Sequence, residues 1–148
     1  MYQNIQSLLL RDLASLQKEI AAYPDDNSLW ATLPGTGNSG GNLALHVAGN
    51  LRHFVGALIG KSGYIRERDL EFSTKNLSRE QVIEILDQCT REVQSALEAC
   101  DESILKTDFP AEIKGTDRQT GAILMHLMAH LNYHLGQINY HRRILGQK

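Results

Sequence analysis

Apolar residues recur at three- and four-residue steps in four long segments of this 148-residue chain. In an α-helix this spacing places the side chains on one face, which then packs against neighbouring helices. The pattern predicts helices over residues 2–22, from 39 or 42 to 59, from 79 to about 101, and over roughly 117–145. No segment shows the alternating pattern of a half-buried strand, and there is no internal repeat. The sequence therefore predicts an all-α, up-and-down four-helix bundle, with one domain spanning residues 1–148.

Local signals mark the expected ends of these helices. Gly60 is the expected C-terminal stop of the second helix. Residues 78–81 and 116–119 both match a capping box, in which two side chains satisfy backbone amides at a helix start, so they are expected to open the third and fourth helices. Residues 24–41 are expected to form a loop, and residues 61–77 a charged connection whose charges face solvent.

The charge balance and the absence of long apolar runs exclude several functional classes. The formal net charge is −2 with a pI near 6.3, which lacks the basic excess of nucleic-acid-binding proteins and of polybasic membrane anchors. No apolar run approaches the ~20 residues of a transmembrane helix. Cys89 and Cys100 lie eleven residues apart on one expected helix, too far to form a disulfide. We therefore expect free thiols in a cytoplasmic protein without nucleic-acid or membrane partners.

Histidines are concentrated near the end of the sequence. Four of the six, His126, His130, His134 and His141, fall within sixteen residues of the last expected helix. The first three are spaced by four residues, so they lie one turn above each other on nearly the same face. Neutral imidazoles stacked in this way can share one metal ion. For an isolated His-x3-His pair, a polar or interhelical hydrogen-bonding stripe is the alternative explanation.

His46 is the candidate for a third ligand. It lies on the second expected helix, where His46, Asn50 and His53 form a polar line beside the apolar stripe. Three protein ligands leave a coordination position for water or substrate, as in a catalytic metal site. The lack of Cys ligands and of a second Glu-rich motif argues against a structural zinc site and a di-iron centre. No Cys-x2-Cys-His motif indicates attached haem.

Two segments resemble the DinB superfamily of four-helix bundles, which includes the YfiT-like metal-dependent hydrolases and the bacillithiol and mycothiol transferases. They are residues 38–50, Asn-Ser-Gly-Gly-Asn-Leu-Ala-Leu-His-Val-Ala-Gly-Asn, and residues 130–138, His-Leu-Asn-Tyr-His-Leu-Gly-Gln-Ile. The resemblance covers nearly the whole chain in element order. It implies that His46, His130 and His134 bind a divalent metal ion, nickel or zinc.

The resemblance gives no ligand role to the other histidines. His126 is expected to be a neighbour turned away from the metal or a group behind the ligands, and His141 a surface or interface residue. The resemblance does not call for His53 either. If the last helix is shifted by one turn, His126 and His130 form the ligand pair instead.

The function that the resemblance implies is transfer of a low-molecular-weight thiol to an electrophile, with the metal holding the thiol as thiolate. The alternatives are a metal-dependent hydrolase and a non-catalytic bundle that acts through dimerisation or partner binding. Asn50, one turn beyond His46, and Tyr133, about 100° around the helix from His134, are candidates for contacts behind the metal or with substrate. The resemblance also implies a homodimer formed by helix packing.

Overall fold

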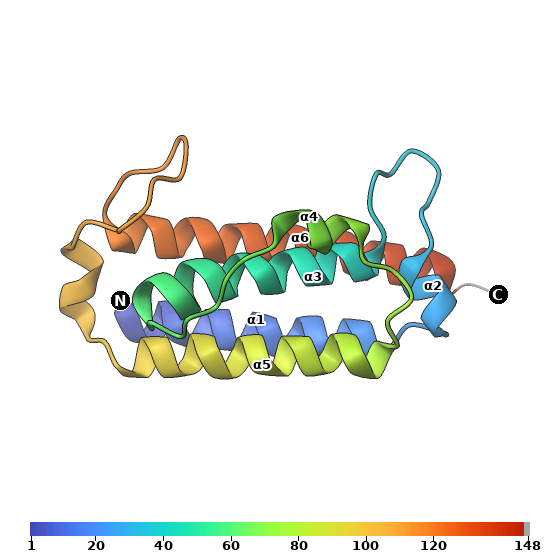
Figure 1. The fold of residues 1–148 in the computed structure, drawn as a ribbon, viewed down its shortest axis with the longest axis horizontal. Helices are drawn as coiled ribbons and strands as arrows, with labels where there is room; N and C mark the ends of the chain where they lie inside the picture. The colour runs from blue at the N-terminus through green and yellow to red at the C-terminus, as the bar shows by residue number, and fades with distance from the viewer. Residues whose placement is uncertain (147–148) are drawn as a thin grey trace.

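Four long helices form the body of the protein, for which the computed structural model describes residues 1–146 (Figure 1). They are α1 (Tyr2–Ala21), α3 (Gly40–Leu51) with its π-helical continuation η1 (Arg52–Ile59), α5 (Arg79–Glu98) and α6 (Thr120–Leu145). Three short helices lie in the connections: α2 (Asp26–Trp30), α4 (Arg68–Ser73) and η2 (Glu102–Lys106). The all-α four-helix bundle predicted from the sequence is confirmed.

The order of the helices in space places α3 beside α6. Helix α1 packs against α5 and α6, and α3 packs against the same two helices. As Figure 1 shows, α1 and α6 run in one direction while α3 and α5 run in the other. The connection between α3 and α5, residues 60–78, therefore returns along the length of the bundle and carries α4 across α3. The order of the helices thus differs from the predicted up-and-down one, because this long connection makes α3 and α5 run in the same direction.

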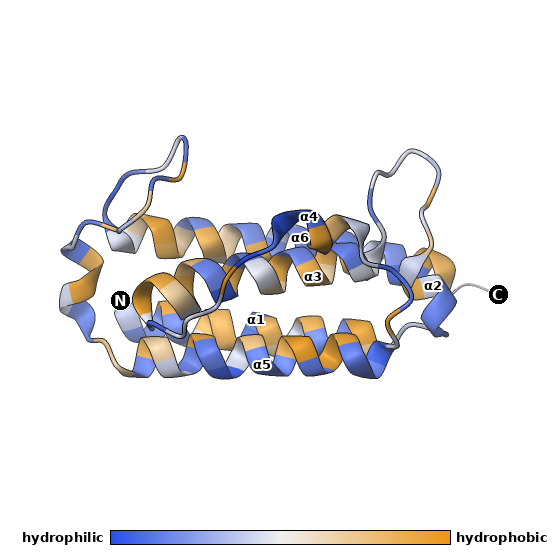
Figure 2. Ribbon diagram, in the orientation of Figure 1, coloured by the Kyte–Doolittle hydropathy of each residue, from blue (hydrophilic) through white to orange (hydrophobic). Residues whose placement is uncertain are grey.

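The core contains the apolar stripes that the periodicity predicted. Each long helix carries both hydrophobic and hydrophilic residues (Figure 2), and the hydrophobic ones include fully buried side chains such as Leu9, Leu13, Leu86 and Leu131. Burying one leucine side chain contributes about 1.5–3 kcal/mol relative to leaving it in water. No helix within residues 1–146 is both long and apolar enough to cross a membrane.

Helix α3 is buried on all sides rather than along one stripe. Every residue from Gly40 to Leu51 is buried, because α5 and α6 cover its inner faces while α4 and α2 also pack against it. Polar residues on α3 are therefore enclosed with the apolar ones, among them Asn42, His46 and Asn50. Enclosed polar groups require partners inside the protein.

One of the two predicted capping boxes is present. The hydroxyl of Ser78 accepts from the amide of Gln81, and the Gln81 side chain accepts from the amide of Ser78. The box predicted at residues 116–119 is wrong, since α6 begins at Thr120 without a side-chain cap. The chain before it stays extended because its backbone pairs with residues 107–109.

Both cysteines are free, as predicted. Cys89 is buried in α5, and burial raises the pKa of its thiol to about 12. Cys100 is half-buried and lies just beyond the end of α5.

Candidate metal centre

Three imidazole rings from two helices meet between α3 and α6. His46 comes from α3, and His130 and His134 come from α6. The Nε2 atom of His130 lies 3.2 Å from the Nε2 atom of His46 and 3.2 Å from that of His134. One nitrogen of each ring lies within 4.8 Å of the other two. The expected convergence of rings from two distant parts of the sequence is confirmed.

The nitrogen spacing fits a divalent ion. Zinc binds imidazole nitrogens at ~2.0–2.1 Å, and a tetrahedral arrangement then separates two ligating nitrogens by about 3.3–3.4 Å. The separations of 3.2 Å from Nε2 of His130 to Nε2 of His46 and of His134 are close to that value. Within residues 1–146 no other group of three or more His, Cys, Asp or Glu side chains comes together in this way.

Glu71 determines which nitrogen of His46 faces the other two rings. Its Oε2 atom lies 2.8 Å from Nδ1 of His46. An ionised carboxylate only accepts hydrogen bonds, so Nδ1 carries the proton and Nε2 presents a lone pair to the cluster. Arg66 Nη2 lies 3.4 Å from the same Nδ1, but both atoms carry protons, so no hydrogen bond joins them.

Arg66 keeps Glu71 ionised although Glu71 is only 5% exposed. Its guanidinium donates to both carboxylate oxygens, from Nε to Oε1 at 2.7 Å and from Nη2 to Oε2 at 3.0 Å. Burial raises the pKa of Glu71, but the hydrogen bonds from His46 and Arg66 outweigh it and hold the pKa below its ordinary value.

Gln137 orients His134 in the same way. Its Oε1 atom lies 2.7 Å from Nδ1 of His134, so Nδ1 donates and Nε2 is left as a lone pair. The Nε2 atom of His130 therefore lies between two lone pairs, and a proton on it forms at most one good hydrogen bond. A cation at this point satisfies all three nitrogens at once.

Burial favours the neutral form of the two rings that α6 contributes, His130 and His134. Burial, followed by the neighbouring rings of His134 and His46, lowers the pKa of His130 to about 4. Burial is also the main cause that lowers the pKa of His134. Neutral imidazole is the form that binds metals, so the lowered pKa values of His130 and His134 favour binding of an ion.

The remaining histidines lie outside the cluster. His126 is exposed, with its Nδ1 3.3 Å from the Thr116 hydroxyl, so the structure places His134 beside His130 and His46 rather than the pair shifted by one turn. His53 is half-buried in η1, where its ring contacts Phe54.

The expectation that His141 is a surface or interface residue is wrong. The residue is only 6% exposed. Its Nδ1 lies 2.7 Å from the Tyr23 hydroxyl, and its Nε2 donates to the carbonyl of Ala31 at 2.9 Å. His141 follows His134 by seven residues, or about two turns, and at that level α6 packs against the α1–α2 region. His141 therefore connects α6, through hydrogen bonds, to the segment between α1 and α3.

The two predicted neighbours of the metal lie in different environments. Asn50 is buried, and its Oδ1 atom has no hydrogen-bond partner within residues 1–146. Tyr133 is exposed, with its ring centre 5.2 Å from that of His134. Neither forms a hydrogen bond with the three clustered rings in the part of the chain that the structure describes.

Comparison with known proteins places the chain in a family. Residues 2–148 match the profile of DUF1572, described as proteins of unknown function. The chain belongs to the DUF1572 family. Its fold matches a crystal structure of a DinB-like protein from Bacillus cereus, with a TM-score of 0.77 and 19% identity over 99% of this chain and 95% of the other. The fold expected from the resemblance is thus confirmed. A search of curated proteins gave no significant match.

The sequence did not predict the groups that hold the histidine cluster in this DUF1572 protein. The charges of residues 61–77 were expected to face solvent, but Glu71 is buried and Arg66 is half-buried beside it. Gly49 faces this carboxylate: a Cβ at Gly49 would lie 2.1 Å from Glu71 Oε1. The Gln137 contact belongs to a His-x2-Gln spacing that puts both side chains on one helical face.

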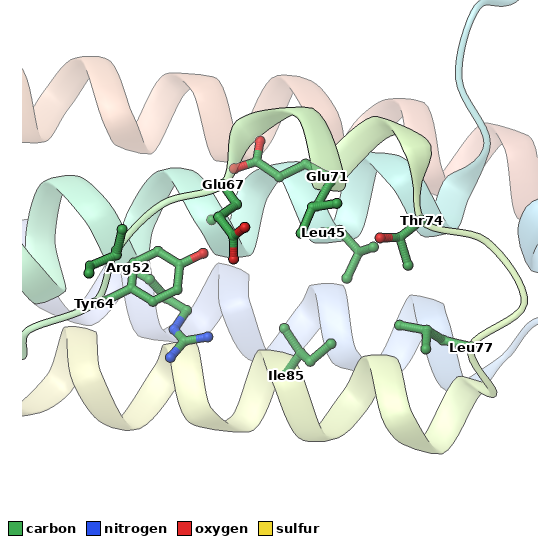
Figure 3. A pocket seen from close by; sticks show the side chains of 11 residues that line it. Leu45, Arg52, Tyr64, Glu67, Glu71, Thr74, Leu77 and Ile85 are labelled. Atoms are coloured by element: carbon green, nitrogen blue, oxygen red, sulfur yellow. The ribbon is translucent and has the colours of Figure 1, made fainter.

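Two cavities flank this region of the DUF1572 protein. One, of about 210 Å³, lies beneath the crossover connection, with Glu71, Arg52 and Tyr64 on its wall (Figure 3). The other, of about 560 Å³, lies between α6 and the loop that precedes α3, and His134 is on its wall. The histidine cluster therefore has one supporting group, Glu71, at the first cavity and one of its own rings at the second.

Proposed function

We propose that this protein binds a divalent zinc or nickel ion through the Nε2 atoms of His46, His130 and His134, and uses it to transfer a low-molecular-weight thiol to an electrophile. The observation that carries the proposal is the meeting of one nitrogen from each of three rings. In two of these rings Nδ1 donates to Glu71 or to Gln137, which leaves Nε2 with a free lone pair. The DinB-like fold supports it.

The charge of the donor set suits an anionic sulfur. Three neutral imidazoles leave the two positive charges of the ion uncompensated, and an ion bound in this way stabilises a thiolate at neutral pH. Three protein ligands also leave a position for an exogenous group. In the reaction the thiol releases its proton to solvent, and its sulfur forms a bond to a carbon of the electrophile. The bond from that carbon to its leaving group breaks, and the leaving group keeps the electron pair.

The surrounding residues act by orienting groups. Glu71 and Arg66 hold the His46 ring, and Gln137 holds the His134 ring. Fixed rings reduce the entropy lost when an ion binds. Tyr133, exposed beside His134, is placed to contact a substrate that reaches this ring.

Metal content is the first test. The purified protein is analysed by plasma mass spectrometry and then, after metal removal, titrated with Zn²⁺ and Ni²⁺ by calorimetry. One ion per chain is the expected result. A protein that neither retains nor binds a stoichiometric ion is instead a bundle that acts without a metal.

The second test separates transfer from hydrolysis. Metal-loaded protein is incubated with monochlorobimane and a panel of low-molecular-weight thiols, and separately with ester and amide substrates. We expect conjugation of at least one thiol above the rate of the metal-free protein. Because half-buried Cys100 is a thiol of the protein itself, a Cys100→Ala variant serves as the working background. Hydrolysis without conjugation would show that the protein is a hydrolase and not a thiol transferase.

A further inference from the structure

The cleft beside His134 has the size of a small-ligand site. Its volume is about 560 Å³, and such sites usually occupy ~300–1,000 Å³. One wall is the second half of α6, and the other is the loop of residues 33–38. The cleft thus lies against a ring of the histidine cluster and also opens to solvent.

The wall of this cleft carries no ionised side chain. Within residues 1–146 no Lys, Arg, Asp or Glu lines it. Its large side chains are apolar or aromatic, among them Leu33, Leu43, Tyr140 and Ile144, and its polar ones include the neutral groups of Thr36, Asn38 and Gln137. The guanidinium of Arg143 lies over the Tyr140 ring, 6.0 Å from its centre, but is not part of the wall.

His141 on this wall is also uncharged near pH 7. Tyr23 and the carbonyl of Ala31 engage both of its ring nitrogens, and burial lowers its pKa. The smaller cavity is different, because Arg52, Glu67 and Glu71 all line it. The walls of the two cavities therefore differ in charge.

Exposed apolar side chains gather along the cleft. Tyr140 is 70% exposed and Ile144 is 52% exposed. Tyr133 lies on the same face of α6 and also lines the cleft. Large apolar groups collected in a concave site usually contact a ligand. An ionised ligand would leave its charge without a partner there, which is costly.

We propose that this cleft binds the electrophilic substrate of the reaction, and that this substrate is an uncharged molecule with an aromatic or aliphatic body. The inference rests on the proposed function and deepens it. Low-molecular-weight thiols commonly carry ionised carboxylates or phosphates, which the wall does not pair, whereas an uncharged electrophile fits the wall. His134 joins this cleft to the histidine cluster.

Two fluorescent probes that differ by one charge test the proposal on metal-free protein. N-phenyl-1-naphthylamine is uncharged, and 1-anilinonaphthalene-8-sulfonate has the same body with a sulfonate. We expect the uncharged probe to bind at least about tenfold more tightly, because no Lys or Arg lines the described wall to pair with the sulfonate. In the Ile144→Glu variant, the Kd of the uncharged probe should rise by at least about tenfold. In Ile144→Lys the preference between the probes should narrow, since the sulfonate gains a partner.

Ile65→Glu is the matched control. Ile65 is 83% exposed and lines the smaller cavity, so its substitution should leave both probe affinities unchanged. The proposal is overturned if the sulfonate binds as well as the uncharged probe, if Ile144→Glu binds the uncharged probe like the original protein, or if neither probe binds. It is also overturned if ultracentrifugation shows a dimer that Ile144→Glu dissociates, because a second copy then covers this face.

A zinc titration of the same preparation separates this proposal from the proposed function. Zinc binding without binding of the uncharged probe refutes the cleft assignment alone. Probe binding without zinc binding refutes the metal-dependent function, and with it the substrate role of the cleft.

Discussion

At the scale of single residues, the three clustered histidines and the exposed histidine on the same helix make a matched set. His46→Ala and His134→Ala should each abolish tight binding of zinc, because each removes one of three ligands. His126→Ala should bind zinc like the original protein, since His126 is exposed and contacts Thr116 instead. His141→Ala should also retain the site. Calorimetric titration measures all four, and equal loss in all of them contradicts the ligand assignment.

Glu71 gives a second prediction at this scale. Glu71→Gln keeps the shape of the side chain but removes its charge, and with it the charge-assisted bonds to His46 and Arg66. Loss of such a partner typically costs 10–100-fold in metal affinity, so we expect the zinc Kd to rise by about that factor. Glu67→Gln, an exposed acid on the same connection, should leave the Kd unchanged. Unaltered zinc binding in Glu71→Gln would show that Glu71 does not contribute to the metal site.

The sequence predicted the meeting of the three rings but not the groups behind them. The positions of His130 and His134 follow from the period of one helix, so spacing alone places them on one face. The contact between His46 and Glu71 joins residues 25 apart through tertiary packing, and no local pattern encodes it. Glu71 also lies among other charges, where solvent exposure is the usual outcome.

At the scale of elements, the packing of α4 on α3 depends on one glycine. A methyl group at Gly49 would lie 2.1 Å from Glu71 Oε1, so Gly49→Ala must push the carboxylate away from His46. We expect weaker zinc binding and lower stability. Gly136→Ala is the same change in α6 at a position with nothing within 4 Å, and should raise stability by about 0.5–1 kcal/mol.

Urea denaturation and zinc titration measure both glycine variants. The prediction for α4 is contradicted if Gly49→Ala binds zinc with the affinity of the original protein. A loss of zinc binding in Gly136→Ala as well would show that both substitutions act through general disruption of the bundle.

Element length decides which helices the sequence reveals. The four long helices repeat their apolar stripe over several turns, so their periodicity is visible. Helices α2, α4 and η2 have five, six and five residues, which is too short for a periodic pattern. Tertiary contacts help to hold α4, since Asn42 of α3 donates to the carbonyls of Glu71 and Thr74.

At the scale of the whole molecule, the His141 contacts predict a pH effect on stability. Burial lowers the pKa of His141 in the folded state, so the unfolded chain binds this proton more readily. The stabilisation is complete above the unfolded pKa of about 6.5 and decreases as the pH falls from there toward the folded pKa.

His141→Gln tests this effect. The loss of unfolding free energy between pH 7.5 and 5.5, measured in urea on metal-free protein, should be smaller in the variant than in the original protein. The other buried histidines remain, so the slope should decrease without disappearing. An identical slope in both proteins would show that His141 does not titrate differently on folding.

The separation in sequence between His46 and the two histidines of α6 also determines when the cluster can form during synthesis. His46 leaves the ribosome 84 residues before His130, and Glu71 follows between them. Until the last helix emerges, a nascent chain offers an ion only the first of three imidazoles. Under the proposed function, metal binding therefore follows completion of the bundle, and an ion cannot serve as a template for the early helices.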